Sequence, residues 1–324
     1  MEYRRLGNSG LKLSALSFGS WVTFKNQVNL KLAEQCLKLA YDAGVNFFDN
    51  AETYANGHSE LILGQALKNL GFDRDSYCVS SKVFFGCRDH PRPTQQGLSR
   101  KHVTEACHQA LARLQVDYLD LYFCHRPDPE TPVEETVRAM HDLIRQGKVL
   151  YWGTSEWPAE AIVAAHRIAR ERNLTPPSVE QPQYNLFTRA RVEQEYAKLY
   201  LEYGMGTTIW SPLASGVLTG KYANGIPKDS RLNLPGYEWL RDRLHTEEGR
   251  RRLGAVENLA VIARELGMRV SQLAIAWCLK NHNVSTVILG ASRLEQLRED
   301  LGALAQVSKL LPDVVARIEA AASA

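Results

Sequence analysis

Residues 44–64, GVNFFDNAETYANGHSELILG, contain the pattern on which the expected fold depends. A short apolar run over residues 45–48 ends at Asp49, and a polar loop carrying Tyr54 leads into a helix-like segment that begins near His58. A strand, a loop with ionisable side chains and a helix form one βα unit, whose polar groups follow the carboxyl end of the strand. Parallel α/β folds place their active sites at that end.

The same unit recurs along the chain. Strands are predicted over residues 13–21, 45–49, 77–82, 118–125, 150–155, 178–181, 207–211 and 286–292. Helices are predicted over residues 30–43, 59–70, 100–114, 133–146, 159–172, 189–203, 251–266 and 294–304. Eight such alternations predict a (β/α)8 TIM barrel in a single domain over residues 1–324. A doubly wound sheet is the competing arrangement, but no Gly-x-Gly-x-x-Gly follows any strand.

Other segments add to this regular pattern. Residues 3–13 predict an N-terminal β-hairpin, and residues 271–280 and 312–321 predict extra helices. Two long loops, 84–99 and 212–250, follow the third and seventh strands. Both belong to the carboxyl-end rim, so we expect them to shape a site or cover a ligand. Residues 84–99 and 212–230 are expected to move when a nucleotide binds.

Composition excludes several classes of protein. The 324 residues are 44% hydrophobic and 23% charged, which allows a sizeable core, and a net charge of +3 does not favour a nucleic-acid partner. No apolar run is long enough to insert in a membrane, and the N-terminus has no apolar signal core. The six cysteines form no CxxC pair and no metal-like spacing. We therefore expect reduced thiols, no metal site and a cytoplasmic location.

Ionisable residues end three successive strands. Asp49, Lys82 and His125 close the second, third and fourth strands, and Tyr54 follows the first of these. In a barrel these strand ends converge on one rim. A Lys ammonium beside a Tyr is expected to lower the phenol pKa from about 10, so that Tyr54 acts as a general acid toward a carbonyl oxygen, with His125 orienting that carbonyl. Each residue alone is more often structural, but the convergent set favours catalysis.

Asp49, Tyr54, Lys82 and His125, in this order and on these strands, resemble the catalytic tetrad of the aldo-keto reductases. The resemblance runs from Tyr3 to the C-terminal helix. It is closest to the branch that contains the β-subunits of voltage-gated potassium channels and their bacterial and plant relatives. The segments that carry it are GLSRKHV (97–103), RPDPETPVEETVRAM (126–140), YWGTS (151–155), LTPPSVEQ (174–181), WSPLASGVLTGKY (210–222) and QLAIAWCL (272–279).

The resemblance implies an NADPH-dependent reduction of a small-molecule aldehyde or ketone, with the cofactor extended across the barrel mouth. It assigns the nicotinamide and substrate side to Ser20, Trp21, Gln27 and Asp49, the carboxamide to Ser155 and Gln181, and the ring stack to Trp210. It assigns the pyrophosphate to Ser211, Pro212, Leu213 and Ser215, and the 2′-phosphate to Lys221 and Arg231. It assigns the adenosine end to Gly290, Ser292, Gln296, Glu299 and Asp300.

The site departs from the channel branch at three positions. The animal channel subunits carry Asn at the position of His125, so this chain has the full reductase tetrad. Glu156 replaces a basic residue, and Asp300 replaces an amide. The rival interpretation is a nucleotide-binding regulatory β-subunit of a potassium channel, and a weaker one is a nucleotide-binding protein with negligible turnover. The branch also implies a homotetramer.

An aromatic rim is expected around the substrate. Its members are Trp21, Phe84, Phe85 and Trp157. Such a rim suits apolar or aromatic aldehydes.

Overall fold

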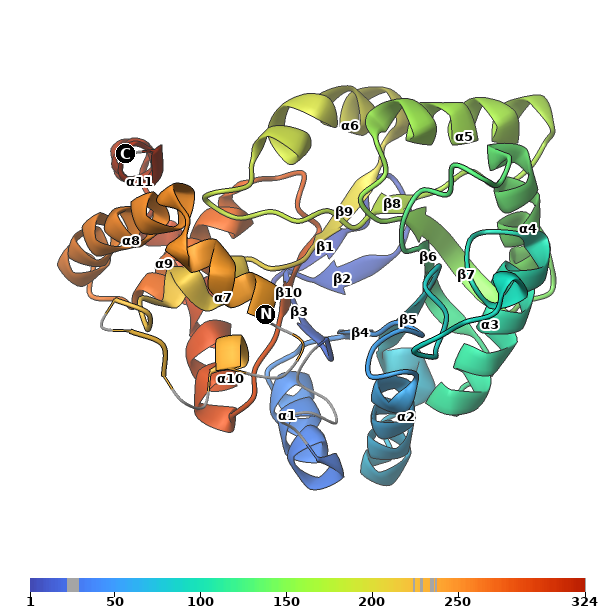
Figure 1. Cartoon of the computed structure of the whole chain (residues 1–324), viewed down its shortest axis with the longest axis horizontal. Coiled ribbons are helices and arrows are strands. Elements are labelled where there is room, and N and C mark those ends of the chain that lie inside the picture. Colours follow the sequence, from blue (N-terminus) through green and yellow to red (C-terminus); the bar gives the residue numbers. More distant parts are fainter. Residues whose placement is uncertain (22–28, 224, 228–229, 234–235, 237, 324) are drawn as a thin grey trace.

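A closed barrel of parallel strands forms the centre of the computed structural model, which describes residues 1–21, 29–223, 225–227, 230–233, 236 and 238–323 (Figure 1). Within these residues the barrel has the strand order β10-β3-β4-β5-β6-β7-β8-β9. The strands are β3 (Leu16–Gly19), β4 (Phe47–Asp49), β5 (Cys78–Val83), β6 (Leu119–Cys124), β7 (Val149–Thr154), β8 (Val179–Glu180), β9 (Gly206–Ile209) and β10 (Thr286–Leu289). The predicted (β/α)8 barrel is confirmed.

Helices surround the barrel and follow most of its strands. They are α1 (Leu30–Asp42), α2 (His58–Leu70), α3 (Arg100–Leu114), α4 (Val133–Arg145), α5 (Ala159–Glu171), α6 (Ala197–Tyr203), α9 (Val270–Lys280) and α10 (Leu294–Leu301). The helix predicted over residues 189–203 is divided, because a π-helical turn at Arg191–Glu195 precedes α6. The chain also forms 3-10 turns at Arg74–Ser76, Pro93–Gln95, Ala214–Thr219, Arg231–Asn233 and Gly302–Lys309.

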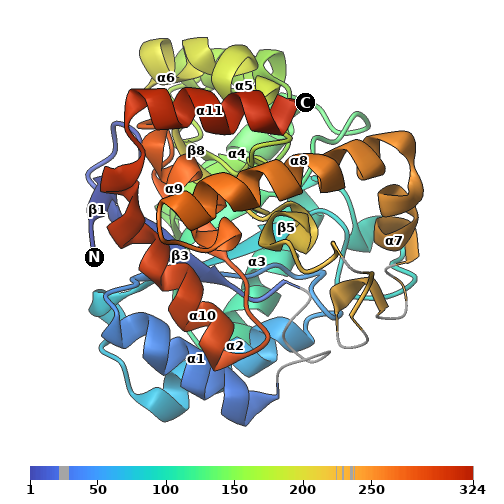
Figure 2. The same cartoon turned by 90° about the vertical axis from the view of Figure 1, so that its left-hand side faces the viewer.

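Three further helices lie outside this ring: α7 (Glu238–His245), α8 (Glu247–Glu265) and α11 (Pro312–Ser323). Helix α8 packs beside α11 (Figure 2). Much of the predicted 212–250 loop is therefore helical. Helix α8 begins four residues before the predicted start because the Thr246 side chain accepts a hydrogen bond from the Gly249 N–H and caps it, with Glu247 and Glu248 in the first turn.

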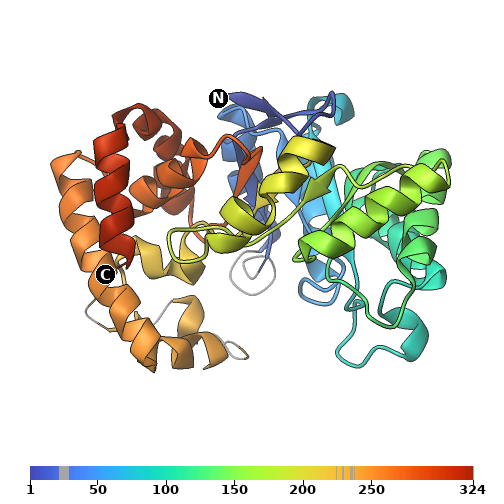
Figure 3. The same ribbon diagram turned by 90° about the horizontal axis from the view of Figure 1, so that it is seen from above.

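The N-terminal hairpin closes one end of the barrel. Strands β1 (Tyr3–Arg5) and β2 (Lys12–Ser14) pair antiparallel, as predicted, and Leu6 and Leu13 join the apolar cluster inside the barrel. In Figure 3 this hairpin (deep blue) lies on the opposite side of the molecule from the segment between β9 and α8 (gold to orange). The other end of the barrel is left to the loops that follow the strands.

Strand alternation explains the polar centre at that other end. Phe47, Cys78, Leu121 and Val179 fill the barrel interior, and residues two positions further along a strand share the same face. The inward positions above this apolar layer are accordingly Asp49, Ser80, Phe123 and Gln181. Phe48 and Val79, on the alternate face, pack in the outer core between strands and helices. The same alternation thus fills the core and directs polar groups toward one end.

Candidate active site

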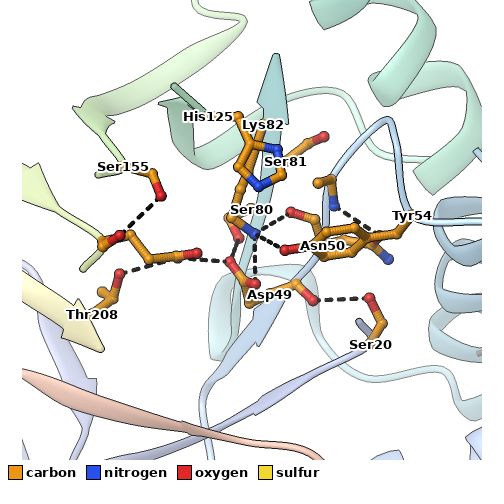
Figure 4. Close-up of polar contacts among 12 residues, drawn as sticks. Ser20, Asp49, Asn50, Tyr54, Ser80, Ser81, Lys82, His125, Ser155 and Thr208 are labelled. Carbon is orange, nitrogen blue, oxygen red and sulfur yellow. Dashed lines mark hydrogen bonds and ion pairs between the residues drawn. The ribbon is translucent and has the colours of Figure 1, made fainter. Parts of the chain in front are cut away.

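Lys82 lies at the centre of the polar cluster. Its Nζ is 2.6 Å from Asp49 Oδ2, 2.7 Å from the Asn50 carbonyl oxygen and 3.1 Å from Tyr54 Oη (Figure 4). Asp49 ends β4, Lys82 lies on β5, and Tyr54 comes from the turn after β4. An ammonium group has three N–H donors, and these three acceptors use all of them.

The Asp49 carboxylate is held from several sides. Ser80 Oγ donates to its Oδ1 at 2.8 Å, and Gln181 Nε2 donates to the same oxygen at 3.0 Å. Ser20 Oγ donates to the Asp49 carbonyl oxygen at 3.1 Å. The Lys82 and Asp49 side chains are only 0% and 4% exposed, so the pair lies beneath the surface of the site. Hydrogen bonds to the remaining oxygen are what make a buried ion pair tolerable.

Burial dominates the protonation of this cluster. It lowers the pKa of Lys82, and the charge of Asp49 opposes that change. It raises the pKa of Tyr54 well above the ordinary value, and the Asp49 carboxylate raises it further. The expected lowering of the Tyr54 pKa is therefore wrong in its net direction, because burial and the Asp49 charge outweigh the lowering effect of Arg126. Tyr54 is a fully protonated phenol at neutral pH.

His125 lies beside Tyr54 as a neutral imidazole. Burial, with the charges of Lys82 and Arg126, holds its pKa well below the usual range. Its ring meets the Tyr54 ring edge-on at 5.8 Å and the Phe85 ring at 5.2 Å. Among the described residues, His125 Nδ1 is buried without a hydrogen-bond partner. A neutral imidazole has one donor and one acceptor nitrogen, which suits it to orient a carbonyl group.

Glu52 fixes the loop that carries Phe85. Its Oε1 accepts hydrogen bonds from the backbone N–H groups of Phe84 and Gly86, each at 2.9 Å, and its Oε2 lies 3.4 Å from His102 Nε2. His102 Nδ1 in turn lies 2.8 Å from the Gly97 carbonyl oxygen. A carboxylate only two residues from Tyr54 therefore ties both ends of the 84–97 loop to the catalytic turn.

A cavity of about 660 Å³ extends from this cluster along the barrel mouth. Most of the residues predicted for the site line it. They are Trp21, Asp49, Tyr54, His125, Ser155, Gln181, Trp210, Ser211, Pro212, Leu213, Ser215, Lys221, Gly290, Ser292, Gln296, Glu299 and Asp300. Residues more than 200 positions apart in the sequence thus share one continuous pocket.

Some predicted residues lie elsewhere. Lys82 and Ser20 are buried and do not line the cavity themselves; Lys82 contacts Asp49 and Tyr54, which do line it, and Ser20 contacts Asp49. Gln27 and the side chain of Arg231 lie outside the part of the chain that is described. Trp157 is 2% exposed and packs in the outer core, so its assignment to the rim is wrong. Phe84 also packs against that core, whereas Phe85 and Trp21 do line the cavity.

The Glu156 carboxylate is bonded to groups of the protein itself. Its Oε1 accepts from the Trp210 indole N–H at 3.1 Å and from the Gln183 N–H at 2.6 Å, and its Oε2 pairs with Arg191 at 2.6 Å. Trp210 contacts Trp21 edge-on, with ring centroids 6.0 Å apart. The acid that replaces a basic residue therefore positions Trp210 and has its charge balanced by Arg191.

The middle of the cavity has an unusual backbone. Ser211, Ala214 and Ser215 adopt positive φ angles of 56°, 47° and 58°, and Gly216 follows at 93°. A Cβ at Gly216 would lie 3.1 Å from Lys221 Nζ, so glycine leaves room for that side chain. Hydrogen bonds within the turn hold this conformation: the Ala214 and Gly216 N–H groups donate to the Ser211 and Leu213 carbonyl oxygens, and the Ser215 N–H donates to Ser211 Oγ. Such strained conformations concentrate at functional sites.

The far end of the cavity is formed by helices rather than strands. Ser271 Oγ donates to Glu299 Oε1 at 3.0 Å, and Arg269 Nε lies 3.1 Å from Glu299 Oε2. Ser292 donates through its N–H and hydroxyl to Gln296 Oε1. Burial raises the pKa of Asp300 to about 7, and the neighbouring Glu299 charge adds to the rise. This end can therefore change charge near neutral pH.

Several lining residues escaped the sequence analysis. They include Thr53, Arg126, Gly216, Thr219, Arg269, Ser271 and Arg293. Arg126 had a usable signal, because it directly follows His125 at a strand end. Arg269 and Ser271 flank the start of α9, and a search confined to strand ends does not reach them.

Comparison with known families fits this geometry. The model of the family described as "Aldo/keto reductase family" matches residues 15–323. The chain belongs to the aldo/keto reductase family. The family is one of oxidoreductases, and the resemblance stated from the sequence is confirmed.

Curated relatives from plants are similar along nearly the whole chain. One from Oryza sativa subsp. japonica is 52% identical over 321 residues, covering 99% of this chain and 96% of its own length. One from Arabidopsis thaliana is 51% identical over 320 residues, covering 98% and 96%. Both are named "Probable voltage-gated potassium channel subunit beta", which matches the predicted branch. Among the described residues, no helix combines the length and apolarity that crossing a membrane requires.

Proposed function

We propose that this aldo/keto reductase uses NADPH to reduce an aldehyde or ketone to the alcohol. The observation that carries the proposal is the position of Lys82, whose ammonium contacts Asp49 and Tyr54 at the inner end of a long cavity. NADPH, when bound, supplies a hydride to the carbonyl carbon. The protein's part is to hold the substrate and cofactor and to supply the proton that the carbonyl oxygen gains.

Tyr54 is the proposed proton donor. Its raised pKa keeps the phenol protonated, and its hydroxyl lies beside the cavity. Proton transfer to the carbonyl oxygen leaves a phenolate, and Lys82 Nζ, 3.1 Å away, stabilises that negative charge. Asp49 keeps Lys82 in its ammonium form and in place. His125, held neutral, donates a hydrogen bond to the carbonyl oxygen without competing for the proton.

The cavity residues suit an extended dinucleotide. We assign the nicotinamide end to Ser155, Gln181 and Trp210, with Trp21 beside the substrate. Gln181 Nε2 bonds Asp49 and Thr208 Oγ1, so its amide oxygen is the group left for a carboxamide. We assign the pyrophosphate to Ser211, Pro212, Leu213 and Ser215, which line the middle of the cavity.

The outer end would hold the adenosine. We assign it to Gly290, Ser292, Gln296, Glu299 and Asp300, all of which line the cavity. Lys221 also lines it and supplies a cation for the 2′-phosphate, which is the basis for proposing NADPH rather than NADH. Arg231 shares this assignment on the family resemblance alone.

A regulatory β-subunit of a potassium channel is the second candidate. It is supported by the names of the two plant relatives. His125 and the complete tetrad favour the enzyme, because a nucleotide sensor does not require rapid proton transfer. We also propose a cytoplasmic location, which the six free cysteines support. We propose a homotetramer on the family resemblance alone.

One experiment tests the main proposal. NADPH consumption is followed across small, aromatic and phosphorylated aldehydes, with NADH as the matched cofactor control. Steady turnover of at least one carbonyl class with NADPH is the expected result. NADPH binding without turnover of any of them would favour the channel subunit, and co-purification with a membrane channel would support that alternative directly.

A further inference from the structure

Arg126 places a positive charge at the substrate end of the cavity. It directly follows His125 after β6, is half-buried, and lines the same cavity as Tyr54 and His125. Its guanidinium carbon lies 5.7 Å from the centre of the Phe85 ring. Phe85 in turn packs against His125. The guanidinium therefore lies over the aromatic wall next to the reacting groups.

The protein supplies Arg126 with neutral partners. Its Nη1 donates to the His125 carbonyl oxygen at 2.5 Å and lies 3.5 Å from Ser155 Oγ. Among the described residues, no carboxylate lies within ion-pair distance of this guanidinium. Residues 22–28, which are not described, contain no Asp or Glu in their sequence VTFKNQV. Arg126 has five N–H donors, and these contacts use only part of them.

Other partly buried arginines of the barrel are arranged differently. Arg74 pairs with Asp120 at 2.7 Å, Arg113 with Glu60 at 2.6 Å, and Arg191 with Glu156 at 2.6 Å. Withdrawing a cation from water is costly unless an anion or good acceptors compensate. The fold meets this requirement at the structural arginines through its own carboxylates. At Arg126, which lines the cavity, a bound ligand would supply the anion.

The charge of Arg126 also reaches the catalytic groups. It lowers the pKa of His125 and of Lys82, and it opposes the rise in the pKa of Tyr54. Geometry agrees with this influence, since the guanidinium lies over Phe85, whose ring centre is 5.2 Å from that of His125, and both Arg126 and Tyr54 line the cavity. A substituted benzaldehyde can carry a carbonyl group and a second polar group on one aromatic ring.

We infer that Arg126 determines specificity for carbonyl substrates that carry a carboxylate, in particular carboxylated aromatic aldehydes. The guanidinium fork matches a carboxylate in two parallel hydrogen bonds. Phe85 and Trp21 provide aromatic surfaces for the ring between the two polar groups. The inference rests on the proposed reductase function and adds the class of substrate.

The test compares matched substrates with NADPH. The isomers 2-, 3- and 4-carboxybenzaldehyde are measured against 4-nitrobenzaldehyde, which is planar, similar in size and uncharged. In Arg126→Gln, kcat/KM for the preferred carboxylate, taken relative to the nitro compound, should fall about 10- to 100-fold, mainly through KM. Arg126→Lys, which keeps the charge but loses the fork, should fall between wild type and Arg126→Gln. Arg145→Gln removes the same charge from the exposed last turn of α4 and should leave the ratio unchanged.

An unchanged ratio in Arg126→Gln would overturn the inference while leaving the reductase proposal intact. A wild-type protein that reduces none of these aldehydes, and none of the small or phosphorylated ones, would instead contradict the proposed function. Titration calorimetry of the NADPH-loaded protein then decides the inference by itself. Tighter binding of 4-(hydroxymethyl)benzoate than of 4-nitrobenzyl alcohol, lost in Arg126→Gln, supports it, and equal binding of the two overturns it.

Discussion

The two ends of the cavity are built by different means. At the inner end, Lys82 and Asp49 form an ion pair whose side chains are 0% and 4% exposed, on strands inside the barrel. At the outer end, Arg269 and Glu299 form a pair whose side chains are 75% and 31% exposed, on helices. At the inner end, strands fix the positions of the charged groups. At the outer end, helices and loops carry them, and Asp300 changes charge near neutral pH. The difference matches the demands of chemistry at one end and of ligand recognition at the other.

Removing the proposed acid should have the largest effect. We expect Tyr54→Phe to lower single-turnover reduction roughly 10²–10⁴-fold, because the general acid is lost while the ring and its packing remain. NADPH affinity, measured by fluorescence titration, should change little. Tyr41→Phe is the control, since Tyr41 donates its hydroxyl to Ser76 on the outside of the barrel. If Tyr54→Phe reduced the aldehyde at a rate within a few-fold of wild type, Tyr54 would not be the proton donor, and the inner end would lose its assigned role in the chemistry.

The two ion pairs should differ in their contribution to stability. Lys82→Met leaves the buried Asp49 carboxylate unpaired, so the free energy of unfolding should fall by about 3–5 kcal/mol. Arg269→Met breaks an exposed pair and should cost less than about 1 kcal/mol. Urea denaturation of both variants measures the difference directly. Equal losses of unfolding free energy in the two variants would show that the buried ion pair contributes no more to stability than the exposed one.

Cofactor preference tests the outer end. Wild type should bind NADPH more tightly than NADH, and Lys221→Ala should reduce that preference by about tenfold, the effect of one charge-assisted contact. The dissociation constants of both cofactors are compared in the two proteins. Lys198→Ala, which alters a lysine of α6 away from the cavity, is the control. Equal affinity for NADPH and NADH in wild type would contradict the assignment of Lys221.

The smallest effect should come from Asp300, whose pKa is raised to about 7 by burial. Below this pH the carboxyl is neutral, and above it the group carries a negative charge beside the proposed phosphate site. NADPH affinity should therefore weaken several-fold between about pH 6 and pH 8. In Asp300→Asn the change should be smaller, since only titration of the nucleotide remains. Identical pH profiles would mean that Asp300 does not titrate near the ligand.

The sequence was most informative about the inner end. Eight alternations of strands and helices predicted the barrel, and the ionisable residues at successive strand ends predicted the convergence of Asp49, Lys82 and His125, since parallel strand ends meet on one rim. The direction of the Tyr54 pKa could not be predicted in this way. It depends on how much solvent the whole fold removes, and the sequence shows only that a cation is near.

The outer end was less predictable for a related reason. Helix α7, EWLRDRLH, is short and strongly polar and follows a segment rich in Gly and Pro, so no clear apolar period marks it. Arg269 and Ser271 reach the cavity through the packing of α9 against its neighbours, which is a tertiary relation. Glu52 was also missed, because two of its partners are backbone N–H groups that any sequence except proline would present, and its third, His102, is distant in the sequence.

That last contact has an evolutionary consequence. Glu52 holds the backbone on both sides of Phe85 and makes no demand on the Phe85 side chain itself. Gly86 is constrained, since its φ is 77° and a Cβ there would lie 2.4 Å from the Gln95 carbonyl oxygen. The Phe85 side chain takes no part in the Glu52 hydrogen bonds, and Phe85 does not have the positive φ that constrains Gly86. Related proteins can thus acquire new substrates by exchanging one side chain at the mouth while the loop that presents it keeps its course.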